Sequence, residues 1–309
     1  MPDAIIRTHG LSKRFGEFTA VDAVSIAVPP GAIFAFLGAN GSGKSTTIRM
    51  LIGLLRPTAG TVEVDGVDVI RHPRRVRDRI GYMGQRVSLY AGLTLRENVE
   101  FYAGLYGLAG AALEERWGAL CERCALGDAE REQTEDLPAG LRQRAGLALS
   151  TLHHPRVLFL DEPTAGVDVH SRALFWDLIQ EEAAAGVTVF VTTHFLEEID
   201  YCDRVAFIEG GRLIADAAPE ELRRRYTDGY RIDVAGPPEA VAMLRAVGLE
   251  GTPRPDGVGF TVPGLAPEVL AALERVAALR PDVRIRIEQP PMTEVFRRVL
   301  AAHGAGGAA

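Results

Sequence analysis

Lysine, cysteine and long apolar segments are all scarce in this sequence of 309 residues. Lys13 and Lys44 are the only lysines among 34 basic residues. The three cysteines, an odd number, fit a reducing compartment. Purely apolar runs have the length of strands, as in 157–160, whereas a membrane helix needs roughly 18 apolar residues. We therefore expect a chain that does not itself cross a bilayer.

Other absent features narrow the function. Residues 1–7 lack the charged and then apolar pattern of a leader, which predicts a cytosolic protein. The net charge is −7, and the longest basic run, 223–225, is better explained as solvated cations near a helix end. This argues against nucleic acid as the main partner. Cys121 and Cys124 form a lone C-x-x-C without a second ligand pair, so we expect them to pack rather than to bind a metal.

A phosphate-binding loop is present. Residues 38–45 read Gly-Ala-Asn-Gly-Ser-Gly-Lys-Ser, which matches G-x-x-x-x-G-K-[ST]. The motif lies between a strand-like apolar segment, 31–37, and a segment of helical periodicity, 45–55. Glycines let successive backbone N–H groups curl around an anion, and the helix N-terminus adds a positive dipole. Lys44 then reaches the outer phosphates, and the Ser45 hydroxyl can ligate Mg²⁺.

Apolar segments alternate with helical ones up to about residue 225, which predicts a parallel sheet covered by helices on both faces. The predicted strands are 5–11, 24–28, 31–37, two within 61–69, 157–160 and 187–192. The predicted helices are 45–55, 94–124, a run after 140, 171–185 and one after 194. We place the first domain at 1–225.

The pattern changes after Tyr226. Residues 229–300 read as a small two-layer βαββαβ domain with a final amphipathic helix. The predicted elements are strand 230–234, helix 237–247, strands 251–254 and 258–262, helix 267–278, strand 283–288 and helix 292–300. The remaining tail, 301–309, is rich in Gly and Ala, and we expect it to be disordered.

Two carboxylates follow the apolar strand 157–160. Asp161 and Glu162 fall at its C-terminal edge, where open parallel sheets place their ligands. Asp161 can hold the water shell of Mg²⁺, and Glu162 can polarise a water for in-line attack on a γ-phosphate. An acidic pair alone is more often a strand-end cap. Its place downstream of a phosphate loop favours the catalytic interpretation.

Together these residues resemble the ATP-binding cassette (ABC) ATPase family over about residues 4–225. The resemblance implies a P-loop α/β fold with a parallel sheet core, an antiparallel β subdomain and a helical subdomain at about 94–150. It implies that Glu162 is the catalytic carboxylate, that His194 is the switch histidine, and that Gln85 contacts the metal or the attacking water. Taken alone, Gln85 would be a loop amide and His194 a surface histidine.

The resemblance also assigns residues to the nucleotide and the metal. Phe15 is placed where the family stacks an aromatic ring on adenine, with Phe18 as a weaker candidate; either ring could instead belong to the core or an edge. The residues assigned to ATP are Phe15, Gly38, Asn40, Gly41, Ser42, Gly43, Lys44, Ser45, Thr46, Pro138, Ala139, Gly140 and Asp168. Those assigned to Mg²⁺ are Ser45, Gln85 and Asp161.

The signature segment departs from the family pattern. Residues 137–141 read Leu-Pro-Ala-Gly-Leu where LSGGQ or similar is expected. In the family, the signature serine of one subunit hydrogen-bonds the γ-phosphate held by the other. Pro138 has neither a hydroxyl nor an N–H. The N–H groups of Ala139 and Gly140 and the helix dipole would have to supply the attraction.

The C-terminal residues resemble one particular group within this family. A βαββαβ appendage closing in 290–296, Pro-Pro-Met-Thr-Glu-Val-Phe, is similar to exporter ATPases of the daunorubicin-resistance and related ABC-2 type. In that group the membrane channel is a separate polypeptide. The resemblance implies a cytoplasmic efflux ATPase subunit, peripheral on the inner face of the membrane, that forms a homodimer or a heterodimer and drives a separate permease. The residues expected either to contact the permease or to join the core are Val87, Leu89, Tyr90 and Leu93.

Two other functions stay open at this point. One is a soluble mechanical ABC ATPase that acts on ribosomes or DNA; the chain shows neither an internal repeat nor a basic arm to favour it. The other is a slow regulatory ATPase, which only Pro138 supports.

Overall fold

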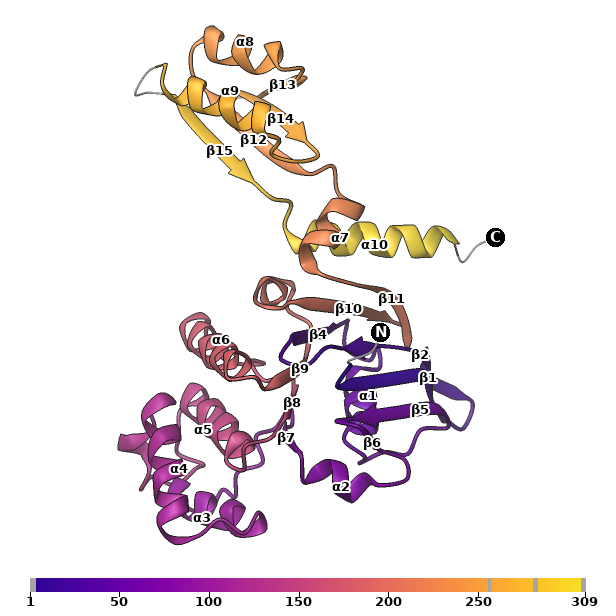
Figure 1. Cartoon of the computed structure of the whole chain (residues 1–309), viewed down its shortest axis with the longest axis vertical. Helices are drawn as coiled ribbons and strands as arrows, with labels where there is room; N and C mark the ends of the chain where they lie inside the picture. The colour runs from indigo at the N-terminus through magenta and orange to yellow at the C-terminus, as the bar shows by residue number, and fades with distance from the viewer. Residues whose placement is uncertain (1–3, 255–256, 280–282, 307–309) are drawn as a thin grey trace. The chain divides into compact units, whose positions relative to one another are not determined.

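The computed structural model describes residues 4–254, 257–279 and 283–306 (Figure 1). The chain divides into two compact units, Met1–Asp216 and Ala217–Ala309. Each unit has its own hydrophobic core. The first contains the phosphate loop and the second contains the predicted βαββαβ segment.

A six-stranded sheet forms the centre of the first unit. In spatial order its strands are β11 (Arg212–Ala217), β10 (Arg204–Glu209), β4 (Ile33–Leu37), β9 (Thr188–Thr193), β8 (Val157–Asp161) and β7 (Ile80–Met83). The neighbours from β10 to β7 pair in parallel. Every residue of β4, β8 and β9 is buried, as expected for strands covered on both faces. The residues that follow these three strands therefore meet at one edge of the sheet.

A second, antiparallel sheet packs against the first. It consists of β2 (Phe18–Val24), β1 (Ile6–Phe15), β5 (Ala59–Val64) and β6 (Val67–Asp68), with β3 (Ala27–Val28) also paired to β1. The sequence predicted the β5–β6 turn correctly but missed β2 and merged its end with β3. The missed strand follows a tight turn at Gly16, whose φ of 58° favours glycine.

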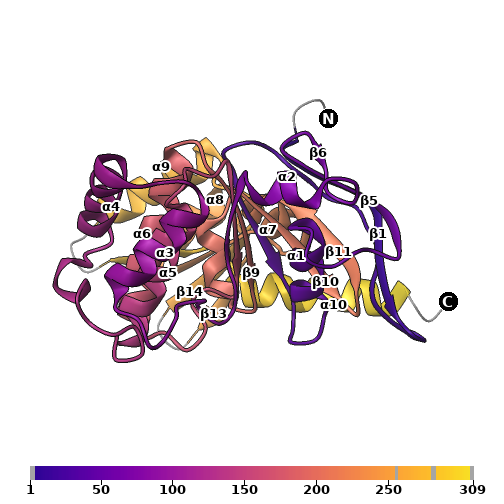
Figure 2. The same cartoon turned by 90° about the horizontal axis from the view of Figure 1, so that it is seen from below.

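Eight helices accompany these sheets within the described part of the first unit. They are α1 (Lys44–Leu51), α2 (Pro73–Arg77), α3 (Leu95–Leu105), α4 (Gly110–Arg123), η1 (Gly127–Ala129), α5 (Ala139–Thr151), α6 (Val169–Ala184) and η2 (Leu196–Tyr201). Helix α1 contacts strands of both sheets. Figures 1 and 2 show α3, α4 and α5 gathered beside the sheets, within the segment predicted to be helical.

Two helical predictions change in detail. The predicted helix 94–124 is broken into α3 and α4, because the chain turns at Gly107 and Gly110, which have φ angles of 70° and 59°. The helix expected after His194 is the short 3₁₀ helix η2 rather than an α-helix. No helix among residues 4–254, 257–279 and 283–306 is both long and apolar enough to cross a membrane.

The second unit contains a four-stranded antiparallel sheet with two helices. In spatial order the strands are β13 (Gly251–Arg254), β14 (Gly257–Val262), β12 (Tyr230–Ala235) and β15 (Arg284–Glu288), and the helices are α8 (Pro238–Ala246) and α9 (Pro267–Ala277). The order along the chain is the predicted βαββαβ. Ile232, Val234 and Phe260 of the sheet share one core with Leu244 of α8 and Leu273 of α9. Burial of each such side chain contributes roughly 1.5–3 kcal/mol.

Two further helices pack together in the second unit: α7 (Pro219–Tyr226) and α10 (Met292–Gly306). Arg223 Nε of α7 donates to Pro290 O at 3.3 Å, just before α10 begins. The division between the units therefore falls before α7, whereas the sequence suggested a first domain that includes this helix.

The last helix is longer than expected. α10 continues to Gly306, into the segment 301–309 that was expected to be disordered. Its extension begins with Ala301 and Ala302, and alanine has the highest intrinsic helix propensity. Residues 307–309 of the expected tail lie outside the described residues.

Candidate functional site

The phosphate loop connects β4 to α1, as the sequence predicted. Gly41 and Gly43 have φ angles of 82° and 108°, in the region that favours glycine. Gly43 is the N-cap of α1, and a Cβ at this position would lie 2.6 Å from the backbone oxygen of Ala20. The first turn of α1 carries no acidic residue of its own. Its N–H groups and the positive end of its dipole are thus available to an anion.

Lys44 is only 4% exposed and has three polar partners. Its Nζ donates to the backbone oxygens of Gly38 at 2.7 Å and Ala39 at 3.1 Å, and it lies 3.0 Å from Glu162 Oε1. A buried ammonium needs such partners because removing a charge from water is costly. An anion bound in the loop would compete with Glu162 for this cation.

Gly38 starts the loop in a crowded position. A Cβ there would lie 2.4 Å from the backbone oxygen of Ile208 and 2.5 Å from Ser42 Oγ, so only glycine fits. Among the residues that the structure describes, the buried Ser42 hydroxyl has no hydrogen-bond partner. Since a buried hydroxyl is normally paired, it is free to bond a ligand in the loop.

Asp161 ends β8 beside the loop and is 2% exposed. Its Oδ1 accepts hydrogen bonds from Ser45 Oγ at 3.2 Å and from Thr192 Oγ1 at 2.6 Å. Mg²⁺ takes oxygen ligands, usually one or two carboxylates together with substrate phosphates. The Ser45 hydroxyl and the Asp161 carboxylate fit this preference. No cluster of three or more His, Cys, Asp or Glu ligands occurs in the described ranges, so a magnesium ion here would depend on phosphate oxygens as well.

Glu162 has a strained backbone and three partners. Its φ is 49°, a region that is uncommon for residues other than glycine and that recurs at functional sites. The Glu162 N–H donates to the backbone oxygen of Thr192 at 3.1 Å and to Thr192 Oγ1 at 3.0 Å. Its Oε2 lies 3.1 Å from His194 Nδ1, while Oε1 faces Lys44. Sequence reasoning missed Thr192, which holds both acids.

A cleft of about 430 Å³ opens above the loop. Its lining residues are Phe15, Phe18, Ala20, Asn40, Gly41, Gly43, Lys44, Ser45, Thr46, Gln85 and Glu162. The exposed Gln85 thus faces the same space as the phosphate loop, although it lies far from it in sequence. Phe15 and Phe18 are 51% and 65% exposed, and Lys13 Nζ lies 5.1 Å from the centre of the Phe15 ring.

The signature residues lie elsewhere and do not line this cleft. Pro138 is the N-cap of α5, with φ −52° and ψ 148°, so Ala139 is the first helical residue. Pro138 and Ala139 are exposed, which leaves their end of α5 open to solvent. Asp168 is the N-cap of α6 and, unlike Pro138, caps with its side chain: its Oδ1 accepts from Ser171 N at 3.0 Å, and this hydrogen bond lowers the pKa of the Asp168 carboxyl.

Helices α5 and α6 approach closely at Gly140. A Cβ on Gly140 would lie 2.6 Å from Ser171 Oγ and 2.9 Å from Ser171 Cβ. Any larger residue would push the two helix N-termini apart. The glycine of the signature segment is therefore explained by packing between α5 and α6, independently of any ligand.

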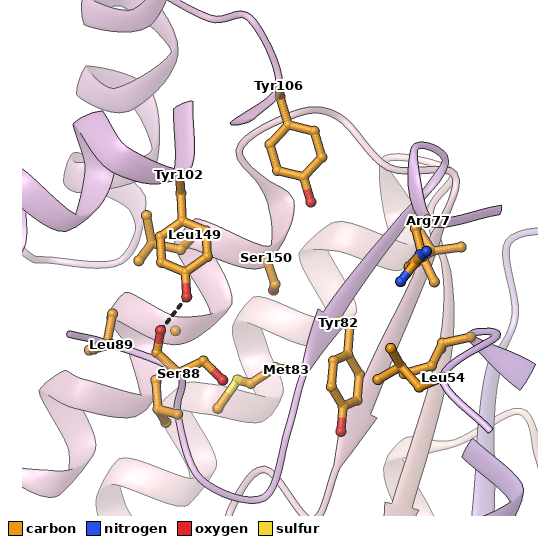
Figure 3. Close-up of a pocket in the computed structure, with 14 residues that line it drawn as sticks. Leu54, Arg77, Tyr82, Met83, Ser88, Leu89, Tyr102, Tyr106, Leu149 and Ser150 are labelled. Carbon is orange, nitrogen blue, oxygen red and sulfur yellow. Dashed lines mark hydrogen bonds between the residues drawn. The ribbon is translucent and has the colours of Figure 1, made fainter. Parts of the chain in front are cut away.

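A second cleft, of about 260 Å³, lies between helices α3 and α5 and strand β7 of the six-stranded sheet (Figure 3). Figure 3 shows Tyr102 and Leu89 on one side and Tyr82 and Leu54 on the other. The Tyr102 hydroxyl donates to the backbone oxygen of Ser88. Burial raises the pKa of Tyr82 and Tyr102 above the ordinary value of a phenol.

The four apolar residues expected after Gln85 separate into two groups. Val87 and Leu89 line the second cleft, and Val87 also packs on Gly146 of α5, where a Cβ would lie 2.5 Å from it. Tyr90 is 50% exposed and meets the Phe101 ring edge-on at 4.8 Å, while Leu93 is partly buried.

The two cysteines of the C-x-x-C pair differ in burial, and Cys121 is only partly buried. Cys124 is buried, and burial raises the pKa of its thiol to about 11. The pKa of the Cys121 thiol is raised for the same reason. A raised pKa makes a thiol a poor nucleophile at neutral pH, because the thiolate is the reactive form.

Comparison with known proteins identifies the family of the chain. Residues 21–165 match the ABC transporter family. The daunorubicin resistance ATP-binding protein DrrA3 of Streptomyces coeruleorubidus is 38% identical over 307 residues, which cover 96% of each chain. The probable multidrug ABC transporter ATP-binding protein YbhF of Escherichia coli K12 is 45% identical over 231 residues. That match covers 75% of this chain but only 40% of YbhF.

Solved structures share the fold of the first unit. An ATP-binding subunit of an ABC transporter superposes with a TM-score of 0.66 at 28% identity, covering 72% of this chain and 93% of that one. The bacterial cassette MJ0796, described as dimeric, gives a TM-score of 0.64 at 23% identity, covering 69% and 98%. The fold and the cleft residues define a P-loop ATP-binding cassette. The chain belongs to the ABC transporter family.

Proposed function

We propose that this chain binds Mg·ATP and hydrolyses it as the ATPase subunit of an exporter. The observation that carries the proposal is Glu162, held between Lys44 at 3.0 Å and His194 at 3.1 Å beside the phosphate loop. A carboxylate in this position can act as a general base where the γ-phosphate would lie. The substrate class, drugs or other exported compounds, follows the names of the relatives.

In the proposed reaction the phosphates occupy the loop and take over the Lys44 ammonium. Glu162 then accepts a proton from a water whose oxygen attacks the γ-phosphorus, while the bond to the β,γ-bridging oxygen breaks and ADP departs. His194 holds the Glu162 carboxylate, and Gln85, which lines the same cleft, orients the water. Mg²⁺, held by Ser45 and Asp161, would neutralise developing charge on the phosphate oxygens.

A second chain would complete the site. Pro138, Ala139 and Asp168 are exposed and do not line the cleft of their own chain, so they are available to a partner's nucleotide. In a head-to-tail pair the N–H groups at the start of α5 would face the γ-phosphate of the partner. MJ0796, described as dimeric, provides a precedent, and the partner here can be a second copy or a different ATPase subunit.

The membrane partner would dock on the second cleft. Its walls carry the apolar side chains of Leu54, Val87 and Leu89 together with three tyrosines, and amphipathic aromatic rings suit a protein interface. Val87 and Leu89 of this cleft follow Gln85 by two and four residues, so a segment of a separate permease seated there would be coupled to the nucleotide cleft. This proposal places the chain in the cytoplasm, on the inner face of the membrane.

The test separates ATP binding from hydrolysis. Glu162→Gln should keep nucleotide affinity but lower turnover by roughly 10²- to 10⁴-fold, because the general base is lost. Lys44→Ala should weaken binding itself, because it removes the cation from the phosphates. Nucleotide titration and phosphate release measure the two effects. Unchanged turnover in Glu162→Gln would remove Glu162 from the mechanism.

A further inference from the structure

A buried carboxylate outside the proposed reaction lies behind His194. Glu198, in η2, is 1% exposed. Its Oε1 accepts a hydrogen bond from Thr164 Oγ1 at 2.5 Å, and its Oε2 accepts one from Thr193 Oγ1 at 2.6 Å. Both threonines are also 1% exposed. Each oxygen of this carboxylate is thus bonded to a different segment of the chain.

The two segments are those that carry the catalytic pair. Thr164 follows Glu162 by two residues, and Thr193 directly precedes His194. The β8–β9 ladder ends with Asp161 opposite Thr192. Beyond it, the backbone bond from Glu162 N to Thr192 O is the last one recorded between these two segments in the described chain. Glu198 spans the two segments just past the point where the sheet stops fixing their separation.

The surroundings of Glu198 favour a structural link over a simple ion pair. Arg172 Nε lies 3.8 Å from Glu198 Oε1, but Arg172 Nη1 is bonded to Glu197 at 3.1 Å and its guanidinium lies 4.0 Å from the centre of the Phe195 ring. The two threonine hydroxyls are therefore the close partners. A carboxylate is an acceptor only, and buried hydroxyls left unpaired are costly, so these bonds reinforce one another.

We propose that Glu198 is a positioning residue that fixes His194 against Glu162 by tying Thr193 to Thr164. The inference rests on the proposed roles of Glu162 and His194. Without these two hydrogen bonds, the segments that carry Glu162 and His194 can shift relative to each other. A misplacement of about 1 Å in a catalytic geometry can lower the rate roughly a hundredfold. The carboxylate of Glu198 is hydrogen-bonded to Thr164 and Thr193 rather than to the phosphate loop, so ATP affinity should be retained.

The first experiment is Glu198→Gln. The amide NH₂ replaces an acceptor oxygen, so it cannot accept the hydrogen bond of one threonine. We expect kcat to fall roughly tenfold to a hundredfold with unchanged affinity for ATP. Glu182→Gln is the matched control, because Glu182 is 4% exposed, pairs with Arg123 on α4, and lies outside both clefts. It should leave kcat unchanged.

The second experiment combines the change with His194→Ala. If Glu198 acts through His194, then Glu198→Gln should lower kcat by no more than about twofold in that background. An equal loss in both backgrounds, or no loss in the folded single variant, overturns the proposal. Full activity of His194→Ala or Glu162→Gln would instead contradict the proposed function. If Glu198→Gln does not fold, Thr193→Val and Thr164→Val each remove one hydroxyl at constant shape, and the same loss of kcat is expected.

Discussion

Two exposed phenylalanines, Phe15 and Phe18, line the nucleotide cleft. Phe15 and Phe18 face each other across the β1–β2 hairpin. Both line the cleft that contains the phosphate loop. A ring that is half exposed at a ligand cleft gains stability when a flat aromatic ligand covers it.

Phe15→Ala should therefore lose about 1–3 kcal/mol of ATP affinity, by analogy with base stacking in other proteins. Stacking does not read the edge of a base, so ATP and GTP should lose affinity alike. Titration with each nucleotide measures this, and Phe18→Ala, which removes the same ring across the hairpin, should lose less. An equal loss for inorganic triphosphate would mean that Phe15 only supports the loop.

Residues within contiguous motifs were predictable from the sequence, and the family resemblance supplied Gln85 and His194, whereas Thr192 was not predicted. Lys44, Ser45, Asp161 and Glu162 belong to short patterns whose spacing carries their chemistry, and the structure brings all four together. Thr192 has no such pattern. Its hydroxyl matters only because β8 and β9 are neighbours in register, which a single sequence does not reveal.

At the scale of elements, the N-terminus of α5 begins at Pro138, where the family pattern expects the signature serine. Pro138 occupies the N-cap with extended backbone, and its oxygen accepts from Arg142 N at 2.9 Å to begin the helix. The N–H groups that follow it receive no side-chain cap in the described structure. They stay available for a phosphate.

Pro138→Ser should consequently change turnover by less than tenfold, with a neutral or harmful outcome. Serine is a favoured N-cap, and its oxygen accepts from the second or third N–H of the helix, which competes with the phosphate. The kcat of Pro138→Ser is measured alongside that of the wild type. Glu162→Gln is measured in parallel to report contaminating ATPase. A tenfold or greater rise would show that the missing hydroxyl limits hydrolysis, since one good donor is worth about 2.7–4 kcal/mol in a comparable site.

Strands and helices were predictable where the apolar residues followed one regular pattern along the segment. Both faces of β4, β8 and β9 are buried, so their apolar runs signalled strands directly. Strand β2 alternates buried and exposed residues less regularly, and its pairing with β1 contains register shifts. These irregularities come from tertiary pairing, which local sequence patterns do not encode.

At the scale of the whole molecule, every residue that lines the nucleotide cleft precedes Asp216. The two units also have separate cores. A fragment that ends at residue 218, which keeps β11 intact, should therefore fold and bind ATP with the affinity of the full chain. Circular dichroism and nucleotide titration test this together. A folded fragment that binds no ATP would show that the second unit helps to form the site.

The pairing of α7 with α10 brings the entry and the exit of the βαββαβ segment to one place. A segment whose two ends lie side by side can be replaced by another segment without moving the helices that flank it, because the replacement only has to bridge a short distance. The α7–α10 pair therefore holds the two ends of this segment together. Residues 229–289 can be replaced by a short flexible link or by the corresponding segment of a relative such as DrrA3. Either replacement should leave α7 packed against α10, which offers a route to chimeric ATPases.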